Sequence, residues 1–379
     1  MTNGALAGTD AAQRRVELRS DTFTLPTPRM LEAMVRAELG DDVYGEDPTA
    51  ARLEALSARL LGKEAGCFVP SGTMANLTSI MTHCPRGAKA IVGDESDIYV
   101  YEAGGASVCG GVVYHPVPNR PDGTLPLDAV RAAFPPDYED PQFARPALLC
   151  LENPQNHSGG RILSMSYLRD VQALARETGI AVHIDGARIF NAALGSGVPV
   201  QEIAACADSV QFCLSKGLGA PVGSMVVGTA PFVAGVRRLR KMLGGGMRQS
   251  GVLAAAGIVA LEDRARLAED HATARQLAQG LAAIPGVSVR PQDVDLNIVF
   301  FRVAAPGLDN AGFIAAAAAR GLSLAELGHG RIRCVTHQGV TPEDVDYALD
   351  VIRSIAAGPA AGPQQARRSH AEFEPAPAH

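Results

Sequence analysis

At 379 residues, the chain is longer than the roughly 250–300 residues at which a single hydrophobic core stops growing, so its length favours two domains. Hydrophobic residues make up 47% and charged residues 20% of the chain, which excludes wholesale disorder. The net charge of −6 argues against a protein that coats nucleic acid or an anionic membrane.

The N-terminal residues and the cysteines of the chain favour a cytoplasmic location. Residues 1–15 lack the apolar segment of a secretory signal, and no run approaches the roughly 20 apolar residues that span a bilayer. The seven cysteines show no CxxC pair and no metal-ligand spacing, which favours reduced thiols in a cytoplasmic protein. We therefore expect no membrane association, no bound metal, a disordered leader over 1–15 and a disordered Ala/Pro/Gly-rich tail over 358–379.

Between these ends, short apolar segments alternate with helical patterns. The expected strands are Gly66–Val69, Ala90–Val92, Val112–Pro116, Ala147–Leu151, Ala181–Ile184, Ser209–Cys213 and Gly223–Val227. Amphipathic segments such as Thr73–His83 and Met165–Thr178 lie between several of them. This alternation predicts an α/β domain over residues 16–250 with a mostly parallel, doubly wound sheet of seven strands.

After Gly251 the pattern changes to that of a smaller α+β unit over residues 251–357. A long helical stretch, Gly251–Ala283, leads to a strand at Leu296–Val303. A helix at Asn310–Arg320 and a strand at Arg331–Thr336 follow. The closing helix begins with the segment TPED, in which Thr341 is the expected N-cap.

Three polar clusters follow expected strands, and ligands bind beyond the carboxyl ends of the strands in an open α/β sheet. Ser71–Asn76 opens a helix whose free N–H groups suit a phosphate, although an ordinary capped turn has the same composition. Asp185 ends an apolar strand and needs a cationic partner, for which Arg188 is one candidate. Lys216 follows another strand. A buried lysine loses its charge easily, which suits Schiff-base chemistry. The alternative is a lysine whose side chain extends to solvent.

Together the three clusters match the requirements of pyridoxal 5′-phosphate (PLP). The helix end would hold the phosphate, Asp185 would keep the pyridine nitrogen protonated, and Lys216 would form the imine. A P-loop, a GxGxxG fingerprint after the first strand, HExxH and GxSxG are all absent from the sequence. A sugar-phosphate or nucleotide-binding enzyme stays the non-PLP alternative.

The sequence resembles the low-specificity L-threonine aldolases, which belong to the β-eliminating lyase group. The resemblance covers roughly Val16 to Ala356 and is carried by the segments ELRSDTF, GDDVYGEDPT, FVPSGTMANL, YEAGGASV, HIDGARIFNA, CLSKGLGAPVGS, RKMLGGGMRQSG and RIRCVTH. It implies the aspartate-aminotransferase-like fold of PLP fold type I, with a small C-terminal α+β domain. It also implies a dimer with shared active sites, commonly assembled into a tetramer, and a small-molecule amino-acid substrate.

The resemblance also implies roles for individual residues. Lys216 forms the internal aldimine, and Asp185 pairs with the pyridine nitrogen. The other residues that contact the cofactor are Gly72, Thr73, Asp97, Arg188, Lys241 and Arg248. The residues that contact the substrate are Ser20, Tyr44, Gln155, Arg188 and Arg333, of which Ser20 and Arg333 grip the α-carboxylate. Tyr44, Arg248 and Lys241 would come from the neighbouring subunit.

Two positions depart from the family pattern. Asp97 stands where the family has a histidine stacked over the cofactor ring, and Gln155 replaces the histidine of the segment ENTHN. Because glutamine cannot act as a base, Asp97 or a bound water would take the proton of the β-hydroxyl. His157 could compensate, but a surface position is the simpler expectation for it.

The resemblance implies retro-aldol cleavage of L-threonine, L-allo-threonine or a related β-hydroxy-α-amino acid into glycine and an aldehyde. The two replaced histidines leave other PLP reactions open. One is β-elimination or aldehyde transfer on a different β-substituted amino acid, with a cationic or polar side chain. Another is a PLP protein with a non-catalytic, regulatory role.

Overall fold

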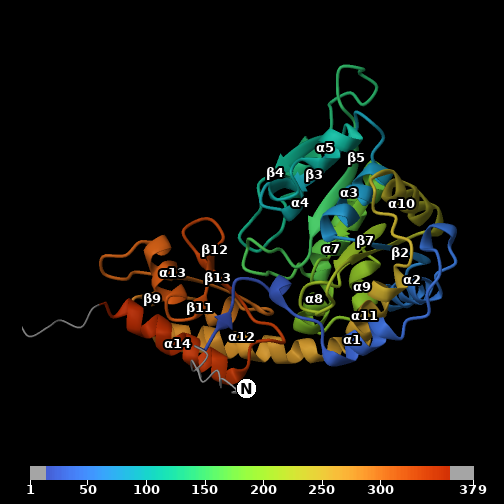
Figure 1. Cartoon of the computed structure of the whole chain (residues 1–379). Helices are drawn as coiled ribbons and strands as arrows, with labels where there is room; N and C mark the ends of the chain where they lie inside the picture. The colour runs from blue at the N-terminus through green and yellow to red at the C-terminus, as the bar shows by residue number, and fades with distance from the viewer. Residues whose placement is uncertain (1–13, 359–379) are drawn as a thin grey trace, which may run out of the picture.

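The computed structural model describes residues 14–358, so most of the expected leader and nearly all of the expected tail lie outside the described residues. Seven strands form the central sheet in the order β2-β8-β7-β6-β5-β3-β4 (Figure 1). Their bounds are β2 Ala65–Val69, β3 Lys89–Gly93, β4 Val113–Val117, β5 Pro146–Glu152, β6 Ala181–Asp185, β7 Ser209–Cys213 and β8 Ser224–Gly228. Only β8 pairs antiparallel, with β2 and with β7. The predicted α/β class and mostly parallel sheet are confirmed.

Helices cover both faces of this sheet, so its strands are buried on both sides except at the edge strand β4. In β2, Phe68 packs into the largest core cluster, whereas Cys67 and Val69 point to the opposite face. The largest cluster joins the sheet to α2 (Pro48–Leu61), α7 (Met165–Thr178), α8 (Ile189–Ser196), α9 (Val200–Ala204) and α11 (Gly251–Glu262). The other face packs against α3 (Gly72–His83), α5 (Gly105–Gly110) and α10 (Ala230–Met242).

A second, antiparallel sheet has the order β12-β13-β10-β9. Its strands are β9 Val287–Ser288, β10 Ile298–Val303, β12 Ala325–Glu326 and β13 Ile332–Val335. It shares a hydrophobic core with α12 (Leu267–Ala282), α13 (Asn310–Ala318) and α14 (Pro342–Ala356). Thr341 caps α14 as expected: its hydroxyl accepts from the Asp344 N–H at 3.2 Å, and the Asp344 carboxylate accepts from the Thr341 N–H at 3.0 Å.

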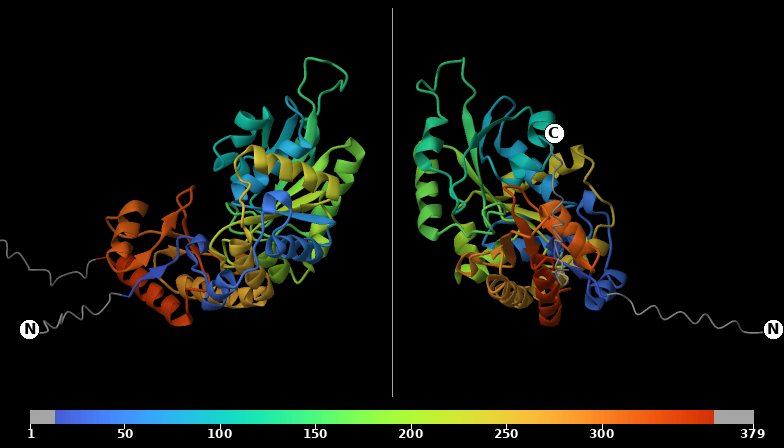
Figure 2. Two further views of the ribbon diagram at one scale, coloured as in Figure 1. Left: turned by 45° about the vertical axis from the view of Figure 1, so that its right-hand side comes forward. Right: turned by 90° about the vertical axis from the view of Figure 1, so that its left-hand side faces the viewer.

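The N-terminal segment belongs to this second core. Strand β1 (Val16–Glu17) pairs in parallel with β11 (Leu322–Ser323), and Val16 and Leu18 are buried in the second cluster (Figure 2). The chain then crosses to the first domain through the short helix η1 (Asp21–Phe23) and α1 (Pro28–Val35). Residues 19–24 therefore lie where the two domains meet.

The expected helical stretch over Gly251–Ala283 is present but is interrupted at Asp263. Helix α11 ends at Glu262, the short helix η3 (Arg264–Arg266) follows, and α12 begins at Leu267. The break lets one face of α11 pack on α1 and α2, whereas α12 packs on α14. The two helices therefore serve different cores, and the packing boundary lies near residues 263–267 rather than at residue 251.

The remaining short elements are α4 Asp97–Val100, α6 Leu127–Ala132, η2 Asp42–Tyr44 and η4 Pro291–Asp293. Among residues 14–358, no helix has both the length and the apolar character needed to cross a membrane.

A buried ion pair fixes the turn η2 against α10. The Arg240 guanidinium lies 2.8 Å from the Asp42 carboxylate and donates to the carbonyl of Phe68 at 2.7 Å. Only 2% of the Arg240 side chain is exposed. Removal of one partner of such a pair leaves an uncompensated buried charge.

We therefore expect Arg240→Met to lower the free energy of unfolding by about 3–5 kcal/mol, measured by urea denaturation. Arg238→Met, on the exposed side of α10, is the matched control and should stay within about 0.5 kcal/mol of wild type. Equal stability of the two variants would contradict the assignment.

Candidate active site

A cavity of about 270 Å³ lies at the carboxyl ends of β2, β6 and β7, next to the first turn of α3. Five of the residues that the sequence selected line it together: Gly72, Thr73, Asp97, Asp185 and Lys216. They come from segments up to 144 residues apart (216 − 72), which the parallel strands bring to one edge of the sheet.

The first turn of α3 forms one end of the cavity. The Ser71 hydroxyl caps the helix by accepting from the Met74 N–H at 3.1 Å, and Gly72 and Thr73 open the turn beside it. A Cβ atom on Gly72 would lie 2.9 Å from the Cys213 sulfur, so only glycine lets the helix start this close to β7. Backbone N–H groups at a helix start suit a phosphate.

Asp185 lies at the other end, fully buried at the last position of β6. Its carboxylate accepts from the Ala187 N–H at 3.0 Å, from Asn76 Nδ2 at 2.8 Å, and from Gln211 Nε2. Burial and the nearby Asp97 charge raise the pKa of Asp185, whereas Lys216 and the two amide donors oppose that rise. A carboxylate held by donors in this way suits a protonated ring nitrogen.

Arg188 is not the partner of Asp185, so that candidate ion pair is wrong. Arg188 instead forms a bidentate pair with Asp21, at 2.8 Å from Nε and 2.7 Å from Nη2. Burial opposes the charge of Asp21, but Arg188 outweighs it and holds the pKa of Asp21 well below its usual range. The pair joins the N-terminal segment to the first turn after β6.

Lys216 follows β7 in a loop that both domains hold. The Thr24 hydroxyl donates to the carbonyl of Lys216 at 3.1 Å, and Arg266 donates to that of Gly217 at 2.7 Å. Burial opposes the charge on Lys216, yet the pKa of Lys216 is raised, because the neighbouring Cys213, followed by Asp97 and Asp185, favours the ammonium. Cys213 and the surrounding carboxylates thus counter the effect of burial on this lysine.

Further acids surround Asp97. The Glu152 carboxyl accepts from the N–H groups of Asp97 and Asn156, both at 2.8 Å, and Asn156 Nδ2 donates to Asp97 Oδ1 at 3.2 Å. Glu102 accepts from Asn76 Nδ2 at 2.8 Å. Burial and the neighbouring Asp185 charge raise the pKa of Glu102 to about 9, so Glu102 is a neutral acid at pH 7, and burial and the Asp97 charge raise the pKa of Glu152 well above its usual value.

Arg333 approaches this cluster from β13 in the second domain. It donates to Asn156 Oδ1 at 3.0 Å and to the carbonyl of Arg19 at 3.0 Å, while its buried Nε has no hydrogen-bond partner among the described residues. Ser20 is the N-cap of η1, and its hydroxyl accepts from the Thr22 N–H at 3.3 Å. Sequence reasoning missed Asn156, which joins Arg333 to Asp97; its place in the NPQN segment carried no signal of that role.

Gln155 and His157 lie next to the cavity lining but not in it. Gln155 holds its own loop, because Nε2 donates to the carbonyl of Glu95 at 3.0 Å and Oε1 accepts from the Ser158 N–H at 2.6 Å. The expected surface position of His157 is wrong: it is 6% exposed and stacks on Tyr101, with ring centroids 5.4 Å apart. The ring is buried because its loop folds under the residues that follow Asp97.

Tyr44, Lys241 and Arg248 are not brought to this cavity. Tyr44 is 77% exposed, and Arg248 pairs with Asp41 at 2.9 Å on the same surface. The Arg248 carbonyl accepts from the Asp42 N–H at 2.8 Å, which holds Arg248 beside the turn that carries Tyr44. Lys241 is exposed near the end of α10.

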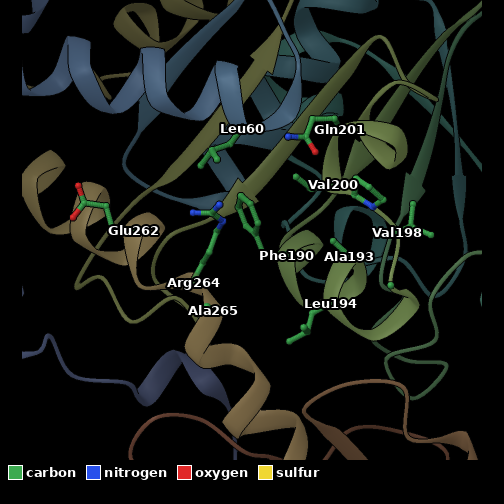
Figure 3. Close-up of a pocket in the computed structure, with 12 residues that line it drawn as sticks. Leu60, Phe190, Ala193, Leu194, Val198, Val200, Gln201, Glu262, Arg264 and Ala265 are labelled. Atoms are coloured by element: carbon green, nitrogen blue, oxygen red, sulfur yellow. The ribbon is translucent and has the colours of Figure 1, made fainter.

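A larger pocket of about 590 Å³ lies among α2, α8, α9 and η3 (Figure 3). Its walls are mainly apolar, with Leu60, Phe190 and Leu194 opposite Arg264. None of the residues that the sequence selected lines this pocket, so size alone does not locate the chemistry.

Comparisons with known proteins agree with this geometry. Residues 17–304 match the family model described as beta-eliminating lyase. Over 344 residues the chain is 47% identical to low-specificity L-threonine aldolase 1 of Arabidopsis thaliana, covering 89% of this chain and 95% of that protein. It is 50% identical over 289 residues to the low specificity L-threonine aldolase of Escherichia coli K12, covering 76% and 84%.

Among solved structures, a threonine aldolase of Leishmania major superposes with a TM-score of 0.76 at 22% identity, covering 90% of this chain and 99% of that one. The predicted fold type and the predicted resemblance are confirmed.

The neutral state of Glu102 predicts a pH dependence of stability. Its pKa of about 9 in the folded state lies above the ordinary 4.5, so the folded protein keeps a proton that the unfolded chain has released. Stability from this group is complete below the unfolded pKa and is lost as pH rises toward the folded one.

We expect Glu102→Gln to flatten the fall in the free energy of unfolding between pH 6 and pH 9 by up to about 1.4 kcal/mol per pH unit. Urea denaturation at several pH values measures this slope. Glu139→Gln, on an exposed loop, should keep the wild-type slope. A wild-type slope in Glu102→Gln would show that Glu102 titrates normally.

Proposed function

Because this chain belongs to the beta-eliminating lyase family and is a PLP-dependent lyase, we propose that it cleaves L-threonine, L-allo-threonine or a related β-hydroxy-α-amino acid. The products are glycine and an aldehyde. One observation carries the proposal: a single cavity places Lys216, Asp185 and the first turn of α3 together, with Asp97 on its wall. The similarity to L-threonine aldolases supports the same reaction.

The residues at the two ends of the cavity bind different parts of the cofactor. The N–H groups at Gly72 and Thr73 bind its phosphate, Lys216 provides the amine that attaches it, and Asp185 keeps its ring nitrogen protonated. Bound PLP supplies a sink for the electron pair that the broken Cα–Cβ bond leaves behind.

The substrate is held from the second domain. Arg333, with Ser20 and Arg188 nearby, binds the α-carboxylate and thereby sets which bond at Cα is aligned for cleavage. Asp97 accepts the proton of the β-hydroxyl as the carbonyl of the leaving aldehyde forms. Asn156 orients both groups, because its amide touches Arg333 with one end and Asp97 with the other. Gln155 acts indirectly, by holding the loop of Asn156.

We infer that Tyr44, Lys241 and Arg248 act in the site of a neighbouring subunit. Their exposure and their absence from their own cavity support a dimer with shared sites, which could pair into a tetramer. A cytoplasmic location is the matching proposal, because six of the seven cysteines are buried thiols that need no oxidising compartment.

One observation favours a second candidate. Asp97 brings a carboxylate to the cavity wall, and such a charge suits a cationic or polar substrate side chain better than the methyl group of threonine does. The alternative function is β-elimination or aldehyde transfer on such a β-substituted amino acid.

A substrate panel with product analysis tests both candidates. The purified holoenzyme should release glycine and acetaldehyde from L-threonine; ammonia and a keto acid would indicate elimination. Asp97→Asn should lower kcat/KM by about 10²–10⁴-fold, the usual contribution of a general base. Asp350→Asn, exposed on α14, is the control. Full activity of Asp97→Asn would show that a bound water, not Asp97, takes the proton of the β-hydroxyl.

A mixed-subunit experiment tests the shared site. Lys216→Ala and Arg248→Ala should each be inactive alone, whereas a co-refolded mixture should regain about a quarter of wild-type activity, since half the dimers carry one intact site. No recovery would place Arg248 in the site of its own subunit. Loss of the visible cofactor absorbance in Lys216→Ala checks that this variant is inactive for the expected reason.

A further inference from the structure

A line of hydrogen bonds leads from Asp185 through the sheet, away from the cavity. Asn76 Nδ2 donates to Asp185 Oδ2 at 2.8 Å, and Asn76 Oδ1 lies 3.1 Å from His183 Nε2. His183 Nδ1 lies 2.8 Å from the Ser209 hydroxyl, which in turn lies 2.8 Å from His83 Nε2. The line thus runs from β6 through α3 and β7 to the end of α3.

The carboxylate end fixes the direction of every bond in this line. The Asn76 amide nitrogen faces both Asp185 and Glu102, so both of its protons are used and its oxygen must face His183. An oxygen there accepts only if His183 carries its proton on Nε2. Neutral His183 then has a bare Nδ1, which accepts from the Ser209 hydroxyl, and Ser209 accepts from His83 Nε2–H.

Both histidines are neutral, as this direction requires. Burial lowers the pKa of His183 to about 3 and that of His83 to about 4. His183, Ser209 and Asn76 are each at most 1% exposed, so no solvent competes within the line. His83 is held in place at the outer end by stacking on Phe232, with ring centroids 4.4 Å apart.

The direction matters because Asp185 lies among other acids. Asp97, Glu102 and Glu152 all face the same region, and Lys216 is its nearby cation. Burial and the Asp97 charge favour the protonated form of Asp185, which could not keep a ring nitrogen protonated. Successive N–H and O–H dipoles that all point toward a carboxylate stabilise its ionised form, and aligned hydrogen bonds polarise one another.

We propose that His183, Ser209 and His83 are positioning residues that lock the Asn76 amide toward Asp185 and so keep this carboxylate ionised against the ring nitrogen of the cofactor. The part that concerns the cofactor rests on the proposed function. The tautomer of His183 does not, because it follows from the protein alone.

The first test is the ¹⁵N NMR spectrum of the histidine rings in the whole protein. His183 should carry its proton on Nε2 and have a bare Nδ1. His271 is an internal control of opposite sense, because its Nε2 lies 3.1 Å from the Asn191 amide nitrogen, which leaves the proton on Nδ1. A proton on Nδ1 of His183, or a charged His183 ring, would overturn the proposal even if the enzyme is an aldolase.

The second test compares His183→Leu with His183→Gln in holoenzyme loaded with PLP labelled with ¹⁵N in its ring. Glutamine keeps an N–H toward Asn76, and leucine removes it. In His183→Leu the signal of the ring nitrogen should move toward the value of the unprotonated form. We expect the ratio of protonated to unprotonated ring nitrogen to fall about tenfold, which corresponds to one pKa unit. In His183→Gln the signal should stay near that of wild type.

Ser209→Ala provides the check if His183→Leu does not fold, and should shift the signal in the same direction by a smaller amount. An unchanged ring nitrogen signal in a folded His183→Leu or Ser209→Ala protein would overturn the proposal. Failure of PLP to bind the wild-type protein would instead overturn the proposed function and leave the histidine tautomers as a separate result.

Discussion

The active site depends on one constraint: the carboxylate of Asp185 is buried at the end of β6 and must stay ionised there. A buried charge survives only with a partner or with several donors. Asp185 has three donors, from Ala187, Asn76 and Gln211, each on a different part of the sheet edge or of α3. The start of α3, the strand β7 and the turn after β6 are thereby fixed relative to one another, and so are the two ends of the cofactor cavity.

The second constraint is the meeting of the two domains. The N-terminal segment packs its apolar residues into the small-domain core and then places Ser20 and Asp21 beside the cavity. Asp21 binds Arg188 of the large domain, and Arg266 at the start of α12 holds the loop of Lys216. Contacts between the domains therefore position both the Lys216 loop and Arg188. The break between α11 and α12 is what lets the chain reach both places.

The acids around Asp97 give this site its particular electrostatics. Burial, with neighbouring charges, raises the pKa of both Glu102 and Glu152, so Glu102 is neutral at pH 7 and the ionised form of Glu152 is disfavoured. Asp97 is the acid whose carboxylate meets both the cavity and Asn156. Asp97 thus brings a carboxylate, held by Asn156, to the wall of the cavity.

The sequence by itself determined the fold class, the seven strands, the family and the residues Gly72, Thr73, Asp185 and Lys216, because strand periodicity and strand-end motifs are local signals. It could not show that Arg188 pairs with Asp21, that Asn156 joins Arg333 to Asp97, or that His157 is buried. Nor could it show the break at Asp263, since helical composition continues through it. These features depend on contacts between segments up to about 180 residues apart, which only the tertiary structure brings together.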